Sequence, residues 1–485
     1  MAVSHTYFFH DYETTGADTR RDRPMQFAGI RTDLDFNIIE EPVMFYCRLS
    51  DDVLPHPQAC LITGITPQQA NAEGYVEAEF MAKVHEELSR PGTCGVGYNS
   101  IRFDDEITRH GLYRNFYDPY AREWQNQCSR WDIIDMLRLT RSLRPDGIEW
   151  PSYADGSPSL RLEDLTKANG IEHGNAHDAL SDVYATIGIA KLVKEKQPRL
   201  FDYVVNHRSK AKIAELIDVA RMKPVLHVSS MYPVELGNAA IVAPIANHPV
   251  NKNAVVVWDL REDPTQLAEL TVEEIKQRLF TPKAEQGEGR SRLPLKLLHL
   301  NKCPIVAPAG MLNTEEAARL KIQGDVCRTH LACLRNMTDV MDRVKAAFEP
   351  EKGQQANDPD LMLYDGGFLG PEDKQATQNI READPEALYE LNPAFQDPRL
   401  EEMFLRYKAR NYPDTLLPEQ RMVWEEFRKA RLLGQDGTGH LSFEGYSSAL
   451  EQAYNNPELA ETQRYILDEL VSYGQSIYPT DDFDY

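Results

Sequence analysis

The chain has 485 residues, of which 42% are hydrophobic and 27% charged, and its formal net charge is −23. This balance excludes fibrous and disordered proteins, and a single hydrophobic core stops growing at roughly 250–300 residues, so two or three domains are expected. The sequence has no apolar run of roughly 18–20 residues and no signal-peptide pattern, and its seven cysteines are scattered, which together predict a cytoplasmic protein with reduced thiols.

The first part of the chain is predicted to alternate strands and helices. The predicted strands cover residues 6–13, 27–30, 43–47 and 95–99, and the predicted helices cover residues 79–88 and 183–193. Such alternation is typical of an α/β domain with a mixed sheet. We therefore expect a first domain over residues 1–196.

Two further domains are predicted after it. Apolar runs at 225–228, 239–242, 254–258 and 293–302, punctuated by Pro and Gly, indicate a small β domain over residues 197–349. The polar segment 349–355 breaks the periodicity and indicates a linker. Helical spacing then returns at 400–408, 419–433 and 463–473, so a mainly α-helical domain is expected over residues 350–485.

Two carboxylates occur in the first predicted strand. Asp11 and Glu13 are two residues apart, so their side chains leave the same face of the sheet. Like charges so close repel unless a cation lies between them, and oxygen ligands of this kind suit Mg²⁺ or Mn²⁺. The alternative is that both residues merely precede the turn at residues 14–16.

A second acidic motif follows the predicted strand at 95–99. Phe103 is followed by Asp104 and Asp105, at the expected start of a helix. Either carboxylate could be a metal ligand. Both could instead be first-turn residues that complement the helix dipole, which requires no ligand.

A third motif precedes the predicted helix 183–193. His177 and Asp182 would lie some 140° apart on one continuous helix, since successive residues rotate by about 100°, so a shared site requires His177 to lie in the preceding loop. Asp178 is a rival to Asp182 as the metal ligand, and it could occupy the cap position at the start of the helix.

The three motifs are far more specific together than alone. Asp-x-Glu-Thr at 11–14, Phe-Asp at 103–104 and His-x4-Asp at 177–182 fall in one predicted α/β domain, in that order. This arrangement resembles the histidine-bearing (DEDDh) branch of the DEDD superfamily of 3′-5′ exonucleases, on a ribonuclease H-like fold. Four further segments resemble the bacterial exodeoxyribonuclease I family, namely residues 98–99, 102–106, 113–120 and 165–173.

This resemblance implies a site and an activity. Asp11, Glu13, Asp104 and Asp182 would hold two Mg²⁺ ions, with Mn²⁺ as a substitute, and His177 would be the general base. Paired ions suit phosphodiester hydrolysis, and a histidine with a pKa near 6.5 can accept the proton of the attacking water. The implied activity is processive 3′-to-5′ degradation of single-stranded DNA to nucleoside 5′-monophosphates, in DNA repair and recombination.

The resemblance also implies the other domains and the partners. Residues 197–349 would form an SH3-like barrel, which closes over the DNA strand together with the helical domain. The C-terminal tail of single-stranded DNA-binding protein is the implied protein partner. The sequence contains no heptad pattern that would demand a dimer, so a monomer is expected.

The expected DNA track combines cations with aromatic rings on which bases can stack. Cations and rings interleave over residues 109–131, although core packing is the alternative for about half of these rings. Arg161 would contact phosphate by the resemblance, or else be a surface arginine at a helix start. The expected substrate-binding residues are Glu13, Arg109, Tyr120, Trp124, Arg138, Arg161, Lys296, Asn301, Lys302, Tyr364 and Phe368. Because the net charge is −23, such a track must be locally basic.

Two rival functions can be weighed on the sequence. An RNA-trimming 3′ exonuclease of the same superfamily would use the same catalytic residues, but such enzymes need little beyond the catalytic domain, and almost three hundred residues follow it here. A binding module with a degenerate nuclease centre is disfavoured, because all five catalytic positions are filled.

Overall fold

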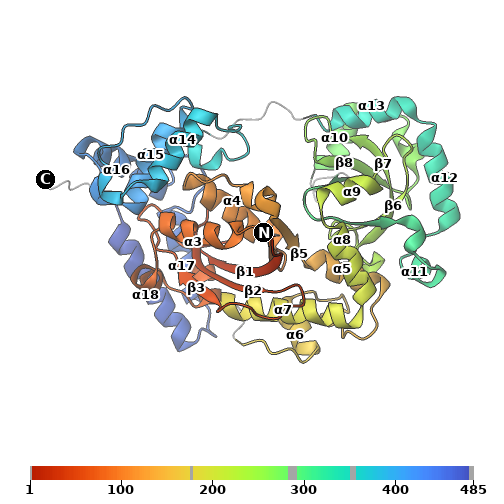
Figure 1. Cartoon of the computed structure of the whole chain (residues 1–485), viewed down its shortest axis with the longest axis horizontal. Coiled ribbons are helices and arrows are strands. Elements are labelled where there is room, and N and C mark those ends of the chain that lie inside the picture. The colour runs from red at the N-terminus through yellow and green to blue at the C-terminus, as the bar shows by residue number, and fades with distance from the viewer. Residues whose placement is uncertain (1–2, 175–177, 282–291, 350–356, 480–485) are drawn as a thin grey trace. The chain divides into compact units, whose positions relative to one another are not determined.

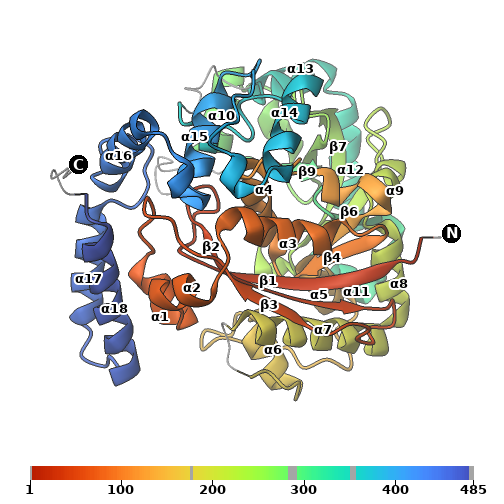
Figure 2. The ribbon, with the colours of Figure 1, turned by 60° about the vertical axis from the view of Figure 1, so that its left-hand side comes forward.

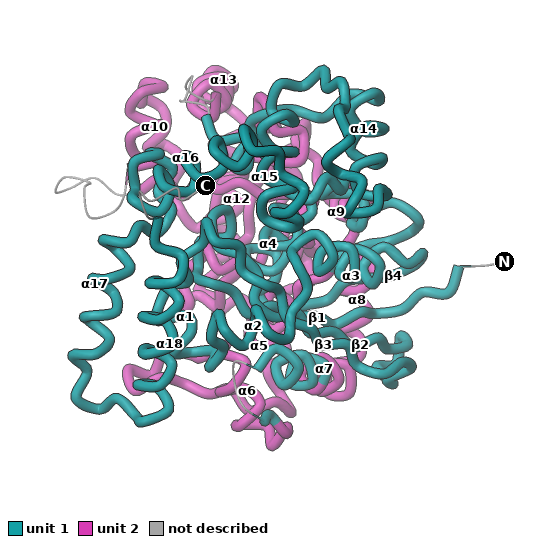
Figure 3. Tube along the Cα trace, turned by 90° about the vertical axis from the view of Figure 1, so that its left-hand side faces the viewer, with its two compact units in different colours: residues 1–130, 173–187, 354–485 teal, residues 131–172, 188–353 magenta. Residues whose placement is uncertain are grey.

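The computed structural model describes residues 3–174, 178–281, 292–349 and 357–479 (Figure 1). The chain forms two compact units, which Figure 3 colours separately. Unit 1 contains Met1–Arg130, His173–Ile187 and Gln354–Tyr485, and unit 2 contains Trp131–Glu172 and Gly188–Gly353. Most of the linker predicted over 349–355 lies outside the described residues.

The N-terminal sheet is mixed, as the sequence predicts. Its five strands run in the order β3-β2-β1-β4-β5, with β1 antiparallel to β2 and parallel to β4. The strands are β1 (Thr6–Thr14), β2 (Pro24–Thr32), β3 (Val43–Tyr46), β4 (Thr93–Gly97) and β5 (Ser129–Asp132). Strand β1 is therefore central, with paired neighbours on both sides.

The two faces of β1 carry different kinds of side chains. Phe8 and Tyr12 point to the face that packs on α3 (Glu77–Ser89) and α4 (Asp104–Arg114), where they join an apolar cluster with Phe80. Because side chains alternate along a strand, Asp11 and Glu13 leave from the opposite face. Helix α7 (Ala179–Lys196) covers that face: the backbone N–H of Ala179 donates to the side chain of Gln26, the cross-strand neighbour of Glu13. Figure 2 shows α3 and α7 on opposite sides of the sheet.

The C-terminal region is helical, as predicted, and packs against the N-terminal region within unit 1. Met25 and Cys60 of the N-terminal region share one buried apolar cluster with Leu432, Tyr446 and Leu467. The helices of unit 1 not yet given are α1 (Pro57–Thr63), α2 (Pro67–Glu73), α14 (Pro371–Glu382), α15 (Arg399–Asn411), α16 (Pro418–Leu432), α17 (Phe443–Tyr454) and α18 (Glu461–Ile477). The first 130 residues and the C-terminal helices therefore share a core.

Unit 2 is built on an antiparallel sheet, in the order β10-β6-β7-β8-β9. The strands are β6 (Val225–Val228), β7 (Ala239–Asn247), β8 (Ala254–Asp259), β9 (Leu295–His299) and β10 (Ile305–Pro308). Helix α7 ends in this unit, from Gly188 onward. The other helices of the unit are α5 (Ile134–Leu143), α6 (Leu162–Ala168), α8 (Pro198–His207), α9 (Lys210–Leu216), α10 (Val272–Phe280), α11 (Thr314–Arg319), α12 (Gly324–Arg335) and α13 (Thr338–Ala347).

Helix α5 belongs to unit 2 although it precedes its strands by some eighty residues. Arg141 on this helix donates to the side chain of Asn238, which lies just before β7. Tyr203 on α8 likewise donates its hydroxyl to the backbone carbonyl of Val306 on β10, over 2.9 Å. Helices from before the β strands therefore pack on this sheet. Among the residues that the structure describes, no helix is both long and apolar enough to span a membrane.

Candidate active site

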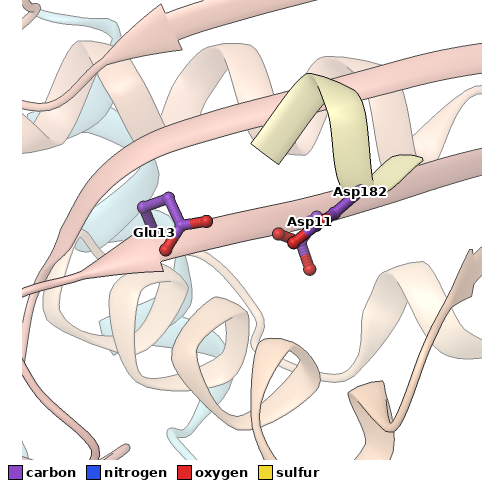
Figure 4. Close-up of side chains that lie close together, drawn as sticks. All are labelled: Asp11, Glu13 and Asp182. Atoms are coloured by element: carbon purple, nitrogen blue, oxygen red, sulfur yellow. The ribbon is translucent and has the colours of Figure 1, made fainter. Parts of the chain in front are cut away.

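Three carboxylates meet at the α7 side of β1. Asp11 and Glu13 come from the strand, and Asp182 comes from the first turn of α7 (Figure 4). Each of them offers one oxygen, and these oxygens lie within 4.8 Å of one another. The structure therefore brings together three of the four carboxylates predicted as metal ligands, from positions almost 170 residues apart in the sequence.

The electrostatics of this group favour a bound cation. Burial, together with the neighbouring charges of Asp182 and Asp104, raises the pKa of Glu13 to about 9. Burial also raises the pKa of Asp11, again with help from Asp104 and Glu13. Carboxylates that repel each other in this way are stabilised when hard divalent ions neutralise them, and an all-oxygen donor set suits Mg²⁺ or Mn²⁺. The residues present therefore fit a divalent metal site.

Asp104 borders the group without belonging to the three that approach most closely. It is buried in the first turn of α4, and its Oδ1 accepts a hydrogen bond from the backbone N–H of Tyr12 over 3.3 Å. Tyr12 lies between Asp11 and Glu13 on β1, so this bond ties α4 to the strand. Asp104 is also the neighbouring charge that raises the pKa of Asp11 most.

Asp105 is held away from the acidic group by two arginines. Its Oδ1 accepts from Arg122 over 2.5 Å, and its Oδ2 accepts from Arg130 over 3.0 Å. Burial alone would raise the pKa of Asp105, but Arg130 and Arg122 hold it well below its usual range. Of the two candidate metal ligands at the start of α4, Asp105 thus belongs to a buried ion-pair network, and Asp104 faces the acidic group.

The segment before α7 also separates its rival residues. Asp178 accepts a hydrogen bond from the backbone N–H of Ser181 over 3.0 Å, the geometry of a helix cap. His177, the predicted general base, lies outside the described residues. His173 was not predicted as a site residue, yet its Nε2 lies 2.6 Å from Oδ1 of Asp182. No spacing rule predicts a role for His173. The sequence offers only its position in the segment 165–173, which resembles the family.

Several predicted DNA-track residues gather in unit 1. Arg109 on α4 is buried, and it makes two hydrogen bonds to Glu123, of 2.7 and 2.9 Å. The same guanidinium donates to the hydroxyl of Tyr364 over 3.1 Å and lies 5.2 Å from the ring centroid of Tyr120. The Tyr120 ring in turn meets the ring of Phe368, 6.1 Å away. Tyr120 and Tyr364 thus contact a fixed cation and Phe368 meets Tyr120, and we call these three rings the aromatic platform.

Exposure separates the residues considered for the DNA track and the interleaved segment 109–131. Phe368 is 87% exposed and Trp124 is 65% exposed, so both can contact a ligand. Trp131 and Arg130, in contrast, are buried in the protein. The expectation that some rings of this segment belong to the core is confirmed for Trp131.

The remaining predicted contacts belong to unit 2. Arg138 pairs with Asp135 over 2.5 Å, and the half-exposed Arg161 pairs with Glu163. Lys296 is partly buried, with its ammonium 5.3 Å from the ring centroid of Tyr232. Asn301 is partly exposed and Lys302 is exposed, directly after β9. Whether these five residues contact a substrate stays a prediction.

Without metal, the acidic group should destabilise the folded protein. A carboxyl whose pKa is raised in the folded state costs nothing below its unfolded value near 4.5, and the cost grows as pH rises towards 9. We therefore expect Glu13→Gln to raise the unfolding free energy in EDTA at pH 8 by about 2 kcal/mol. Thermal unfolding at pH 5 and pH 8 checks this. An equal gain at both pH values would contradict it.

A mixed sheet whose central strand and covering helix bring carboxylates together is the arrangement expected of a metal-dependent exonuclease domain of the ribonuclease H-like class. A family model described as exonuclease matches residues 8–190. The exonuclease I SH3-like domain matches residues 208–350, and the exonuclease I C-terminal domain matches residues 357–477. The chain therefore belongs to the exonuclease I family.

Relatives with curated names agree with this assignment. The chain is 50% identical to exodeoxyribonuclease I of Escherichia coli strain K12 over 425 residues, which cover 87% of this chain and 89% of the relative. It is 47% identical to exodeoxyribonuclease I of Haemophilus influenzae over 434 residues, which cover 89% and 92% of the two chains.

Solved structures are similar over nearly the whole chain. Exonuclease I of Methylocaldum szegediense gives a TM-score of 0.93 at 50% identity, covering 98% of this chain and 99% of the other. Escherichia coli exonuclease I in complex with a dA16 oligonucleotide gives 0.93 at 46% identity, covering 98% and 100%. The predicted family, its exonuclease domain, SH3-like domain and helical C-terminal domain are confirmed, and the chain is an exonuclease.

Proposed function

We propose that this exonuclease removes nucleotides from the 3′ end of single-stranded DNA and releases nucleoside 5′-monophosphates. The observation that carries the proposal is the meeting of Asp11, Glu13 and Asp182 at one divalent metal site. The substrate is supported by structures of Escherichia coli exonuclease I with dA16 and dT13 oligonucleotides, which are similar over 98% of this chain.

The chain's own residues supply the arrangement for hydrolysis. Two divalent ions, when bound, activate a water and stabilise the attacking and leaving oxygens of an in-line displacement. Asp11, Glu13, Asp104 and Asp182 would hold them, with Asp104 anchored through the backbone of Tyr12. We assign the general base to His177, because the imidazole accepts a proton near neutral pH.

We propose Mg²⁺ as the working ion and Mn²⁺ as a substitute. Metal dependence itself follows from the exonuclease family and from the acidic group, and a zinc-bound form of Escherichia coli exonuclease I with single-stranded DNA is among the similar structures. The carboxylate-only donor set of the described residues favours a hard ion over zinc, which prefers nitrogen and sulfur ligands.

The remaining assignments also belong to this proposal. Substrate contacts are proposed for the aromatic platform of Tyr120, Tyr364 and Phe368, for Trp124 and for Arg161. Glu13 would touch the terminal nucleotide. We propose that the protein works as a cytoplasmic monomer in DNA repair and recombination, where the C-terminal tail of single-stranded DNA-binding protein recruits it. These assignments rest on the family resemblance.

Phe368→Ala should weaken the binding of single-stranded DNA. The ring is 87% exposed beside Tyr120, and stacking contributes about 1–3 kcal/mol per base, so Kd should rise roughly 5–150-fold. Fluorescence anisotropy of a labelled oligonucleotide in EDTA measures this change. Tyr389→Ala, which removes a 53% exposed ring outside the platform, is the matched control and should leave Kd unchanged. Equal effects of the two variants would contradict the assignment.

The proposed activity is tested on a 5′-labelled DNA strand. With Mg²⁺, the protein should shorten the single strand progressively from its 3′ end, and EDTA should stop it. A blunt duplex of the same sequence should remain intact. An RNA strand of equal length tests the RNA-trimming alternative, which the relatives and the DNA complexes do not favour. Faster shortening of RNA than of DNA would overturn the proposed substrate.

A further inference from the structure

We propose that His173 is a positioning residue of the active site, which orients the carboxylate of Asp182 for metal binding. This inference rests on the proposed function and adds a residue to it. The Nε2 atom of His173 lies 2.6 Å from Oδ1 of Asp182, and both residues belong to unit 1. An ionised carboxylate only accepts hydrogen bonds, so Nε2–H is the donor in this pair.

The contact is short and shielded from solvent. The side chain of His173 is 9% exposed and that of Asp182 is 19% exposed. Hydrogen bonds to charged groups are shorter and about twice as strong as neutral ones, and shielding from water strengthens them. The bond therefore restrains the rotation of the Asp182 carboxylate relative to Asp11 and Glu13.

The backbone next to His173 runs close to the start of α7. A Cβ atom at Gly174 would lie 3.0 Å from Oγ of Ser181, so the absence of a side chain allows this approach. Ser181 directly precedes Asp182 on the helix. The loop thus holds the imidazole against the turn that carries the metal ligand.

This geometry gives His173 a different task from that of a general base. Its Nε2 is hydrogen-bonded to the carboxylate of Asp182, which would itself bind an ion. The imidazole therefore contacts the metal ligand and not the reacting water. Mutation of groups that orient metal ligands in this way typically lowers metal affinity or activity 10–100-fold. His173 should therefore act on metal binding, and on catalysis only through it.

The experiment compares His173→Ala and His173→Gln with the native chain. Binding of Mn²⁺ to the full chain, without DNA, is measured by electron paramagnetic resonance. We expect His173→Ala to raise the Kd for Mn²⁺ about tenfold and to raise the Mg²⁺ concentration needed for half-maximal kcat by a similar factor. KM for single-stranded DNA should stay unchanged. His173→Gln should restore most of the affinity, since its amide N–H can still donate.

The controls separate this role from others. Glu172→Gln changes the exposed neighbour on the same loop and should bind Mn²⁺ like the native chain. Unchanged Mn²⁺ binding in His173→Ala would overturn the proposal. So would loss of the acidic limb of the pH–rate profile with unchanged metal affinity, because His173 would then be a base. If the thermal midpoint of His173→Ala falls, the Mn²⁺ affinity of this variant no longer isolates the hydrogen bond. The Mn²⁺ affinity of His173→Gln relative to that of the native chain then decides whether the proposal holds.

The Mn²⁺ measurement also keeps the two proposals distinguishable. A native chain that binds Mn²⁺ but leaves single-stranded DNA intact would refute the proposed function. The comparison of His173 variants would still show whether this residue orients Asp182.

Discussion

Asp182→Asn is expected to lower kcat on single-stranded DNA by at least about 1000-fold, while Asp178→Asn should stay within about threefold of the native value. The amide in place of Asp182 removes one anionic ligand from the group with Asp11 and Glu13. Metal ions contribute several kcal/mol of charge stabilisation to such reactions, and about 4 kcal/mol corresponds to a factor of 1000.

Asp178→Asn is a matched control because it lies four residues away at the start of the same helix. Its carboxylate caps the backbone of Ser181, and asparagine caps helices about as well as aspartate. Single-turnover assays with saturating Mg²⁺ measure both variants. Comparable losses in the two would mean that Asp178, and not Asp182 alone, completes the metal site.

Asp104→Asn and Asp105→Asn extend this reasoning to α4. Asp104 faces the acidic group, so its amide should lower kcat and leave stability almost unchanged. Asp105 pairs with Arg122 and Arg130, so its amide should lower the thermal midpoint by several degrees instead. Thermal scans and single-turnover rates on both variants check the division of roles. A catalytic loss in Asp105→Asn without a change in midpoint would contradict it.

The sequence was sufficient to predict the strand that carries the chemistry. The run from residue 6 to residue 13 is rich in aromatic residues, and it forms β1 with Asp11 and Glu13 on one face. A period of two fixes that shared face whatever the neighbouring strands are. The three spaced motifs then identified the family, which the matched domains confirm.

The choice between adjacent carboxylates could not be predicted in this way. Asp104 and Asp105 are both first-turn residues of α4, separated by about 100° around its axis. Their roles differ because Arg122 and Arg130, which lie 17 and 25 residues later, both donate to Asp105. Such pairing depends on where distant segments meet, and no local pattern contains that information. The contact between His173 and Asp182 was missed for the same reason.

The grouping of segments into compact units was also beyond the reach of local patterns. The predicted domains divide the chain in order, at residues 196 and 349. In the structure, residues 131–172 pack in the unit of the β domain, and residues from 354 onward share a core with the first 130 residues. Hydrophobic periodicity shows that a helix has an apolar face, but it does not show which segment covers that face.

Arg431→Met is expected to lower the unfolding free energy by about 3–5 kcal/mol, because it removes one partner from a buried ion cluster. Arg431 donates to Asp52 over 3.0 Å and to Asp358 over 2.5 Å. Arg410 donates to Asp52 over 2.9 Å and to Asp360 over 2.7 Å. All five side chains are at most 4% exposed. The cluster therefore joins the N-terminal region to the C-terminal helices inside unit 1.

The pH dependence gives this prediction its sharpest test. Burial alone would raise the pKa of Asp52, but Arg410 and Arg431 hold it well below its usual range. A lowered pKa contributes stability that is present above the unfolded value near 4 and is lost as pH falls below it. The gap in urea stability between the native chain and Arg431→Met should therefore be largest at neutral pH and shrink towards pH 3.

Arg328→Met, which removes an exposed pair with Asp325, should change stability by less than about 0.5 kcal/mol. A gap that is constant from pH 7 to pH 3 would mean that Arg431 acts by packing and not by charge.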